Sequence, residues 1–167
     1  MVLTKSELID GLQNEVRILL HLTTKIEPNM VDYRPTEKQR STIELLQYLT
    51  VMGPVLVKAA LTGTFDREEW GARSAAVKDK DLAGVVAVLA AHAKEYNDLL
   101  AGVPDEAFRK EVDFFGTKSS AGAFIVRMVL GGCAAYRTQL FCYLKACGRS
   151  EHGTMNLWGG IDPPPAD

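Results

Sequence analysis

Apolar residues recur at spacings of three and four positions in four separate stretches of the chain. In the first stretch, Leu8, Leu12, Val16 and Leu19 follow this spacing, and polar side chains fill most positions between them. The spacing places apolar side chains on one face of a helix, so each stretch predicts a helix with a buried face. The predicted helices cover about residues 5–26, 42–61, 80–101 and 120–147.

Local signals place the ends of these helices. Thr4 and Ser41 each stand three positions before a glutamate, which is the spacing of a capping box at a helix start. Gly148 follows the last apolar position and predicts a C-terminal helix end. Between the third and fourth helices, residues 108–115 predict a short extended piece.

Four long helices with apolar faces predict an all-α fold, a four-helix bundle. The length favours one domain over residues 1–167, with a C-terminal tail over 149–167. The connectors 27–40 and 62–80 are long, and the second is predicted to hold only a short turn near residues 66–70. Such connectors indicate that at least one of them joins helices that are not simple up-down neighbours.

Charge and cysteine content narrow the functional classes. The chain has 19 basic and 21 acidic residues, and no basic cluster is interleaved with aromatic residues, which argues against nucleic acid or an anionic membrane as a partner. Its first residues lack the apolar core of a signal peptide, and no uncharged apolar run approaches the roughly 18 residues of a membrane span. Three cysteines without a Cys-x-x-Cys pair predict reduced thiols in a cytoplasmic protein, with Cys133 and Cys142 as small core residues.

Three further side chains have simple structural interpretations. His21 lies among charged positions and is interpreted as a solvated surface histidine, and His92 as a hydrogen-bonded residue at the edge of the core. Trp158 in the C-terminal tail is predicted to fold back onto the bundle.

Two segments resemble a known family. Residues 40–49 read Arg-Ser-Thr-Ile-Glu-Leu-Leu-Gln-Tyr-Leu, similar to the second-helix signature Arg-Ser-x-x-Glu-Leu-Leu-x-His-Leu of the DinB/YfiT-like proteins. Residues 136–148 begin Tyr-Arg-Thr-Gln-Leu and continue through Tyr-Leu-Lys to a glycine, similar to the family's last-helix signature His-Arg-Gly-Gln-Leu-x-x-Tyr-Leu-Arg-x-x-Gly. The resemblance implies a bundle of up-down-down-up topology, often a homodimer. Family members of known activity are metal-dependent enzymes of thiol-transferase or isomerase type that use a low-molecular-weight thiol.

The chain departs from this family at the metal ligands. The three histidines that hold the family's metal correspond here to Tyr48, Gly132 and Tyr136. Zinc and nickel prefer imidazole, thiolate or carboxylate donors, whereas a phenol with a pKa near 10 is a weak ligand and glycine has no side chain. Cys133 lies about 100° around the helix from the lost ligand, and Glu44, one turn before Tyr48, offers too little for a closed site. We therefore expect no cofactor, with a divalent metal, zinc or nickel, as the alternative.

Two glycines in the middle of the last predicted helix, Gly131 and Gly132, need an explanation, because each costs roughly 1 kcal/mol relative to alanine. One hypothesis is a size exchange, in which the missing side chain at Gly132 makes room for the Tyr48 ring. The other is that both glycines only permit close helix packing. In the second predicted helix, Gly53-Pro54 predicts a kink.

Two classes of function remain open. In the first, the chain is a metal-free relative that binds a small-molecule ligand, or dimerises, through the family's pocket. The residues expected to line that pocket are Glu44, Tyr48, Gly132, Cys133, Tyr136 and Gln139. In the second, it is still an enzyme. It either works without metal, using a tyrosine as acid or Cys133 as nucleophile, although no base is placed to activate either group, or is a metal-dependent or thiol-dependent transferase or hydrolase with a non-standard site.

Overall fold

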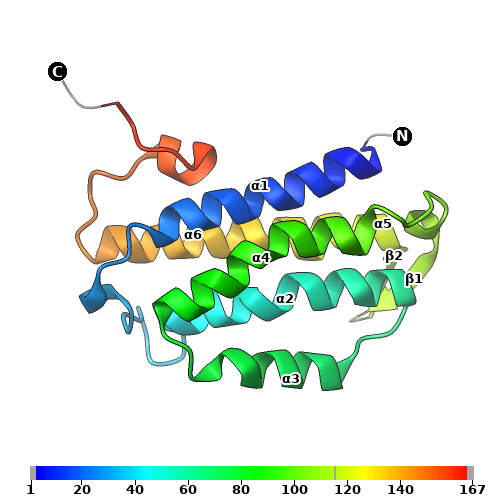
Figure 1. Cartoon of the computed structure of the whole chain (residues 1–167), viewed down its shortest axis with the longest axis horizontal. Helices are drawn as coiled ribbons and strands as arrows, with labels where there is room; N and C mark the ends of the chain where they lie inside the picture. The colour runs from blue at the N-terminus through cyan, green and yellow to red at the C-terminus, as the bar shows by residue number, and fades with distance from the viewer. Residues whose placement is uncertain (1–2, 115, 165–167) are drawn as a thin grey trace.

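The computed structural model describes residues 3–114 and 116–164. Its long helices form the predicted bundle, with boundaries close to the expected ones (Figure 1). The last helix, residues 121–146, is continuous but contains a π-helical segment. The bundle helices are α1 (Lys5–Thr23), α2 (Thr42–Thr62), α4 (Leu82–Leu100) and the last helix, composed of α5 (Ala121–Phe124), η3 (Ile125–Leu130) and α6 (Gly131–Ala146).

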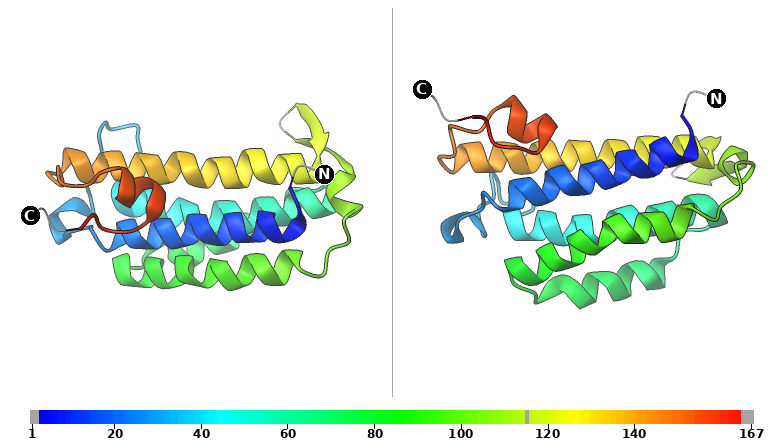
Figure 2. Two further views of the ribbon diagram at one scale, coloured as in Figure 1. Left: turned by 90° about the horizontal axis from the view of Figure 1, so that it is seen from above. Right: turned by 45° about the horizontal axis from the view of Figure 1, so that its top comes forward.

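The helix directions confirm the up-down-down-up topology. The last helix runs parallel to α1, whereas α2 and α4 run in the opposite direction (Figures 1 and 2). Helix α4 packs against both α1 and α2, and α6 contacts α1 and α2 from the other side. The core is therefore enclosed by four helices in a square arrangement.

The connector between α2 and α4 differs from the prediction. Where only a short turn was expected, the chain forms a 12-residue helix, α3 (Arg67–Lys78), which packs along α2 (Figure 1). Asp66 caps it by accepting a hydrogen bond from the Glu69 backbone N–H at 2.8 Å. Val77 is the one wholly buried residue of α3. Because the helix buries so little, the sequence of α3 shows almost no apolar periodicity. This helix returns the chain and allows α2 and α4 to run parallel.

Side chains form the predicted caps at the helix starts. Thr4 and Ser41 each take part in a complete capping box with the glutamate three positions later. Ser120 caps the last helix, and Gly148 follows it with a φ of 105°. Helix α1 ends at Thr23 rather than at residue 26, and the next residues form turns.

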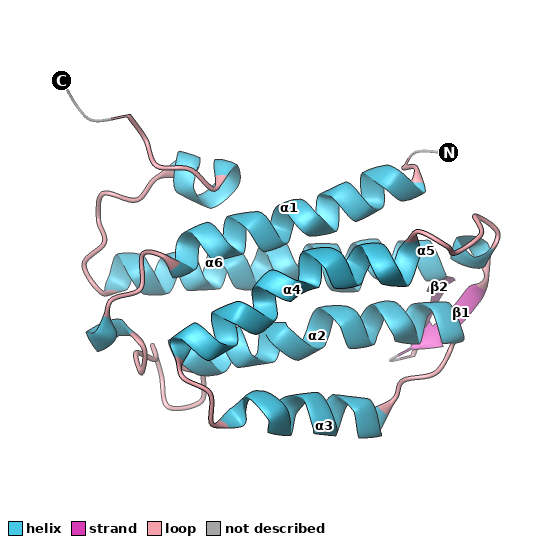
Figure 3. Ribbon diagram, in the orientation of Figure 1, coloured by secondary structure: helices cyan, strands magenta, loops and turns pink. Residues whose placement is uncertain are grey.

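A two-stranded antiparallel hairpin precedes the last helix (Figure 3). Its strands are β1 (Glu111–Phe114) and β2 (Thr117–Ser120), and β1 lies within the predicted extended piece. A 3-10 turn, η2 (Ala107–Arg109), precedes β1. Phe114 packs on Phe124, with ring centroids 4.9 Å apart, which fixes the hairpin to the bundle. Phe115, at the end of the predicted piece, lies outside the described residues.

The described part of the C-terminal tail folds back along α1 through a short π-helical turn, η4 (Met155–Gly159), as Figure 2 shows. The indole of Trp158 still remains 68% exposed. His21 is not solvated as predicted, because the tail covers it: Asn156 donates to its Nε2 at 3.2 Å, and the carboxylate of Asp162 lies 3.6 Å away. Residues 165–167 of the predicted tail lie outside the described residues.

Two further predictions concern cysteines and membranes. Cys142 is exposed rather than part of the core, and Cys133 is partly buried against the core. Helix α2 has the length and composition of a membrane span, but 72% of that window is buried inside the bundle. A core helix of a folded domain passes the same test.

Candidate functional site

Helices α2 and α6 bring together two of the positions that correspond to metal ligands. The rings of Tyr48 and Tyr136 are in contact, with centroids 5.1 Å apart and planes at 67°, an edge-to-face arrangement. Trp70 of α3 contacts the Tyr48 ring at 5.8 Å, and the Arg40 guanidinium lies 3.9 Å from its centroid. Tyr48 is therefore enclosed by three aromatic or cationic neighbours.

The electrostatics keep the Tyr48 phenol neutral. Burial raises the pKa of Tyr48 to about 12, and the hydrogen bond with Tyr136 acts in the same direction, while Arg40 opposes the shift. A phenol that loses its proton only near this value offers no anionic oxygen to a metal at neutral pH. The pair supplies hydrogen-bonding hydroxyl groups on an aromatic surface, and this donor set does not fit zinc or nickel.

The third ligand position, Gly132, faces a different neighbour from the one expected. A Cβ built on Gly132 lies 3.2 Å from the Met52 sulfur and 3.4 Å from its methyl group. The space left by the glycine is therefore taken by Met52, one turn along α2 from Tyr48, and the size exchange with Tyr48 is wrong. The preceding Gly131 closes the π-helical segment by donating its N–H to the Val126 carbonyl.

Glu44 is occupied by structural contacts. One carboxylate oxygen accepts from the Ser41 N–H at 2.8 Å, and the other accepts from Arg34 at 2.9 Å. The bond from Ser41, the largest effect, lowers the pKa of Glu44, and the contact with Arg34 acts in the same direction, while burial opposes them. Its oxygens thus complete the helix cap.

Gln139 and Cys133 point to separate partners. Gln139 donates to the Tyr143 hydroxyl, which in turn donates to the Arg40 carbonyl at 2.9 Å. Cys133 is hydrogen-bonded to Tyr96 of α4, and burial raises its pKa to about 12. Among the six expected pocket residues, the structure thus brings Tyr48 and Tyr136 into direct ring contact.

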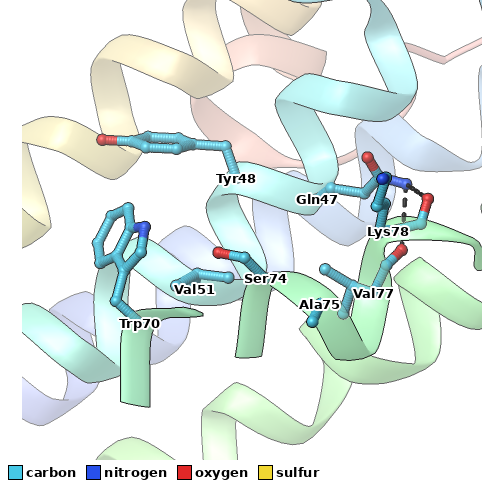
Figure 4. Close-up of a pocket in the computed structure, with 8 residues that line it drawn as sticks. All are labelled: Gln47, Tyr48, Val51, Trp70, Ser74, Ala75, Val77 and Lys78. Carbon is cyan, nitrogen blue, oxygen red and sulfur yellow. Dashed lines mark hydrogen bonds between the residues drawn. The ribbon is translucent and has the colours of Figure 1, made fainter. Parts of the chain in front are cut away.

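A cavity of about 300 Å³ lies beside Tyr48, between α2 and α3 (Figure 4). Tyr48 and Trp70 stand at one end of it, and the Ser74 hydroxyl and Val51 lie between them and the far end (Figure 4). At the far end, Gln47 donates its amide N–H groups to the carbonyls of Val77 and Lys78 at 3.1 and 3.0 Å. The lining residues are Gln47, Tyr48, Val51, Trp70, Ser74, Ala75, Val77 and Lys78. The sequence pointed only to Tyr48, because the others depend on α3.

Comparisons with known proteins bear on the architecture. A crystal structure of a DinB-like protein from Bacillus subtilis, YjoA, superposes with a TM-score of 0.66, at 18% sequence identity, over 89% of this chain and 94% of that chain. The chain has a DinB-like fold. The sequence itself matches no family model and no curated protein. Among the described residues of this DinB-like fold, no three His, Cys, Asp or Glu side chains are grouped so that they could hold a metal ion.

The DinB-like bundle also holds a buried polar cluster that the sequence did not indicate. Arg137 of α6 forms a two-point ion pair with Glu15 of α1, with N–O distances of 2.8 and 3.2 Å. The two side chains are only 4% and 12% exposed. Arg137 also donates to the carbonyl of Leu157, and its guanidinium faces the Trp158 ring at 5.6 Å. One buried side chain thus joins α1, α6 and the tail.

Pro54 accounts for a separate buried polar contact, between α2 and α4. A proline has no N–H, so the carbonyl four residues earlier, that of Thr50, has no helical donor. His92 of α4 lies 3.0 Å from this carbonyl through Nε2, and because a carbonyl can only accept, Nε2 carries the proton. Burial, the largest effect, lowers the pKa of His92. The prediction of a hydrogen-bonded histidine is confirmed, although His92 is fully buried rather than at the edge of the core.

Proposed function

We propose that this DinB-like chain is a metal-independent protein that binds a small aromatic molecule in the cavity between α2 and α3. The observation that carries the proposal is the aromatic end of the cavity, where Tyr48 contacts Trp70 while sharing a hydrogen bond with Tyr136. Small-ligand sites are mostly apolar with a few polar groups that set orientation. Here the apolar walls carry the Ser74 hydroxyl and the Gln47 carboxamide as those groups.

A cavity-filling substitution tests this proposal. Ala75 is exposed and lines the cavity, so Ala75→Phe fills the space from outside without disturbing the core or adding a second indole. The neighbouring Ala76 is also exposed and lies outside the lining, so Ala76→Phe is the matched control. In a Trp158→Phe background, the indole N–H signal of Trp70 reports binding in NMR spectra. We expect small phenols and aromatic amides to shift this signal in the background protein and in the Ala76 variant, and not in the Ala75 variant. Equal shifts in both variants, or no shift in any protein, would contradict the proposal.

We also propose that the exchange of histidines for Tyr48, Gly132 and Tyr136 removed the metal site. The support is chemical: two neutral phenols and a hydrogen atom replace three imidazoles. After incubation with zinc or nickel and desalting, we expect elemental analysis of the wild-type protein to find no stoichiometric metal. Stoichiometric metal that disappears in the Tyr136→Ala variant would contradict this.

A gain-of-function variant provides the positive control. Histidines at positions 48, 132 and 136, combined with Met52→Ala to make room beside residue 132, restore the three imidazoles. We expect this variant to retain about one zinc ion per chain under the same conditions.

The enzymatic alternative has less support. The Cys133 thiol, with a pKa raised to about 12 by burial, is almost entirely protonated at neutral pH and is a poor nucleophile. A thiol-transfer assay with and without added metal is expected to give no turnover above background. The homodimer remains a proposal, which light scattering tests through the molar mass in solution.

A further inference from the structure

Another cavity lies far from Tyr48, at the opposite end of the bundle. The start of α1, the loop before β1 and the start of the last helix meet at this end (Figure 1). Residues of all three line the cavity, which has a volume of about 830 Å³. Ligand sites for small molecules typically measure on the order of 300–1,000 Å³. The size of this cavity therefore suits a small molecule rather than a single ion or water.

The walls of this cavity are apolar. Leu8 and Leu130 form part of its surface, and the Leu130 side chain packs over Gly11, where a Cβ would lie 3.6 Å from its nearest methyl group. Leu3 and Val126 also line it, and both are 39% exposed, among the most exposed large apolar side chains that the structure describes. Apolar side chains that face water inside a concave surface are typical of a binding site.

The polar groups of the cavity carry a net positive charge. Lys5, Arg109 and Asp105 line it, so two cationic side chains accompany one carboxylate. The Lys5 ammonium donates to the carbonyls of Ala101 and Val103 at 2.8 and 2.9 Å, which holds the start of α1 against the loop after α4. Arg109 is exposed, and its planar guanidinium can bind a carboxylate through two N–H groups.

The backbone along one wall is irregular. The π-helical segment η3 runs from Ile125 to Leu130, and Val126 and Leu130, which line the cavity, both belong to it. Such segments are rare and occur frequently at functional sites. At Gly122, a Cβ would lie 3.2 Å from the Phe108 carbonyl, so the missing side chain lets the loop with Arg109 approach the helix closely.

We propose that this cavity is a second binding site, which takes a small amphipathic monoanion: an apolar body against Leu130 and Val126, and a carboxylate paired with Arg109. The size, the apolar walls and the net charge support this class of ligand together. The site is independent of the cavity beside Tyr48, so either can exist without the other.

Calorimetric titration of the full chain with decanoate, and with decanol as the uncharged counterpart, tests this proposal. We expect one saturable decanoate site per chain. Arg109→Gln should weaken decanoate binding about tenfold, the effect of losing one charge-assisted contact, and leave the weaker decanol binding unchanged. Val126→Glu should abolish binding of decanoate by placing a carboxylate in the apolar wall.

Matched variants separate this effect from general changes of the surface. Arg127 is an exposed arginine beside Val126 that does not line the cavity, so Arg127→Gln is the control for Arg109→Gln. Ile161 is 50% exposed on the tail, so Ile161→Glu is the control for Val126→Glu. Both controls should bind decanoate like the wild type, and thermal melts should show all variants folded.

Three outcomes overturn the proposal. The first is the absence of saturable decanoate binding, and the second is binding that survives Val126→Glu or is weakened equally by the control variants. The third is a wild-type protein that is a dimer and does not bind decanoate, and that becomes a monomer when Val126→Glu is introduced. The apolar surface would then be an interface between two copies of the chain. Aromatic probes of the Tyr48 cavity should be unaffected by every variant in this series.

Discussion

Single residues decide how closely the bundle helices approach. Tyr96 of α4 is the largest fully buried side chain, and its hydroxyl occupies the space beside Gly53, where a Cβ would lie only 1.9 Å from that oxygen. A size exchange thus exists in this core, but between Gly53 and Tyr96 rather than between Gly132 and Tyr48. Such a contact requires glycine, because protein interiors are close-packed and tolerate little added volume.

Replacing Gly53 with alanine is expected to destabilise the fold. Overpacking typically costs about 1–3 kcal/mol, occasionally more. Because the added methyl group would lie 1.9 Å from the Tyr96 hydroxyl, we expect the upper part of this range, which exceeds the roughly 1 kcal/mol that alanine contributes to helix propensity. Denaturant unfolding measures the difference. The Tyr96→Phe substitution removes the overlapping oxygen, so it should recover part of the loss in the double variant. A Gly53→Ala protein as stable as the wild type would refute this packing.

At the scale of elements, the Glu15–Arg137 pair joins α1 to α6 and to the tail. Both side chains are buried, so each charge needs the other to offset the cost of removing it from water. Most other ion pairs in the described chain lie near the surface, where such pairs contribute little. The tail adds its own contacts, because Arg17 donates to the carbonyl of Gly159 at 2.9 Å and Lys25 pairs with Asp162 at 2.6 Å. Arg137 thus couples the tail to both α1 and α6, beside the contacts that Arg17 and Lys25 make with the tail.

Breaking the buried pair from one side should cost more than removing both charges. Arg137→Met leaves the Glu15 carboxylate buried without a partner, at a cost of about 3–5 kcal/mol. The double variant Arg137→Met with Glu15→Gln should recover a large part of this loss, as measured by urea unfolding. Hydrogen exchange should also rise in residues 153–162 of the Arg137→Met variant, because the tail loses its bond through the Leu157 carbonyl. Equal stability of the single and double variants would contradict the coupling.

At the scale of the whole molecule, all three histidines make the fold less stable as the pH falls. Burial is the largest cause that lowers the pKa of His21, His92 and His152 below the ordinary value of 6.5. The unfolded chain therefore binds more protons than the folded chain as the pH falls through this range. The contribution of the neutral histidines to the free energy of unfolding is complete above about pH 6.5. It is lost as the pH decreases toward the lowered pKa values.

The melting temperature is consequently expected to fall between pH 7 and pH 5. In this window the carboxylates with lowered pKa, such as Glu44 and Asp162, remain ionised and change little, so the fall reports the histidines. His92→Gln removes one of the three titrating groups and should make the decrease with pH shallower, whatever its effect on stability at pH 7. A melting temperature independent of pH across this window would contradict the expected loss.

Periodicity and capping residues were enough to predict a bundle of four long helices and nearly all helix ends, whereas the up-down-down-up topology was expected from the resemblance. The same reasoning missed α3, because a helix that fully buries only Val77 has no apolar stripe to detect. Sequence reasoning expected Tyr48 and Tyr136 to lie together because the resemblance identifies them as two of the three metal-ligand positions. It did not identify Met52 as the neighbour of Gly132 or Tyr96 as the neighbour of Gly53, because these contacts depend on how helices cross. The environment of His21 was likewise set by a tail more than 130 positions away in the sequence.

Helix α3 forms the outer wall of the cavity beside Tyr48, and ion pairs join it to both α2 and α4 in addition to its apolar contacts. Glu69 bridges Lys58 and Arg73 at 2.6 and 2.9 Å, and Arg73 continues to Glu95 of α4. Partly exposed ion pairs weaken as dissolved salt screens them, whereas the apolar core does not. Rising ionic strength is thus expected to weaken the ion pairs of α3 while the apolar core keeps the four bundle helices in place, so that dissolved salt acts first on this wall of the proposed site.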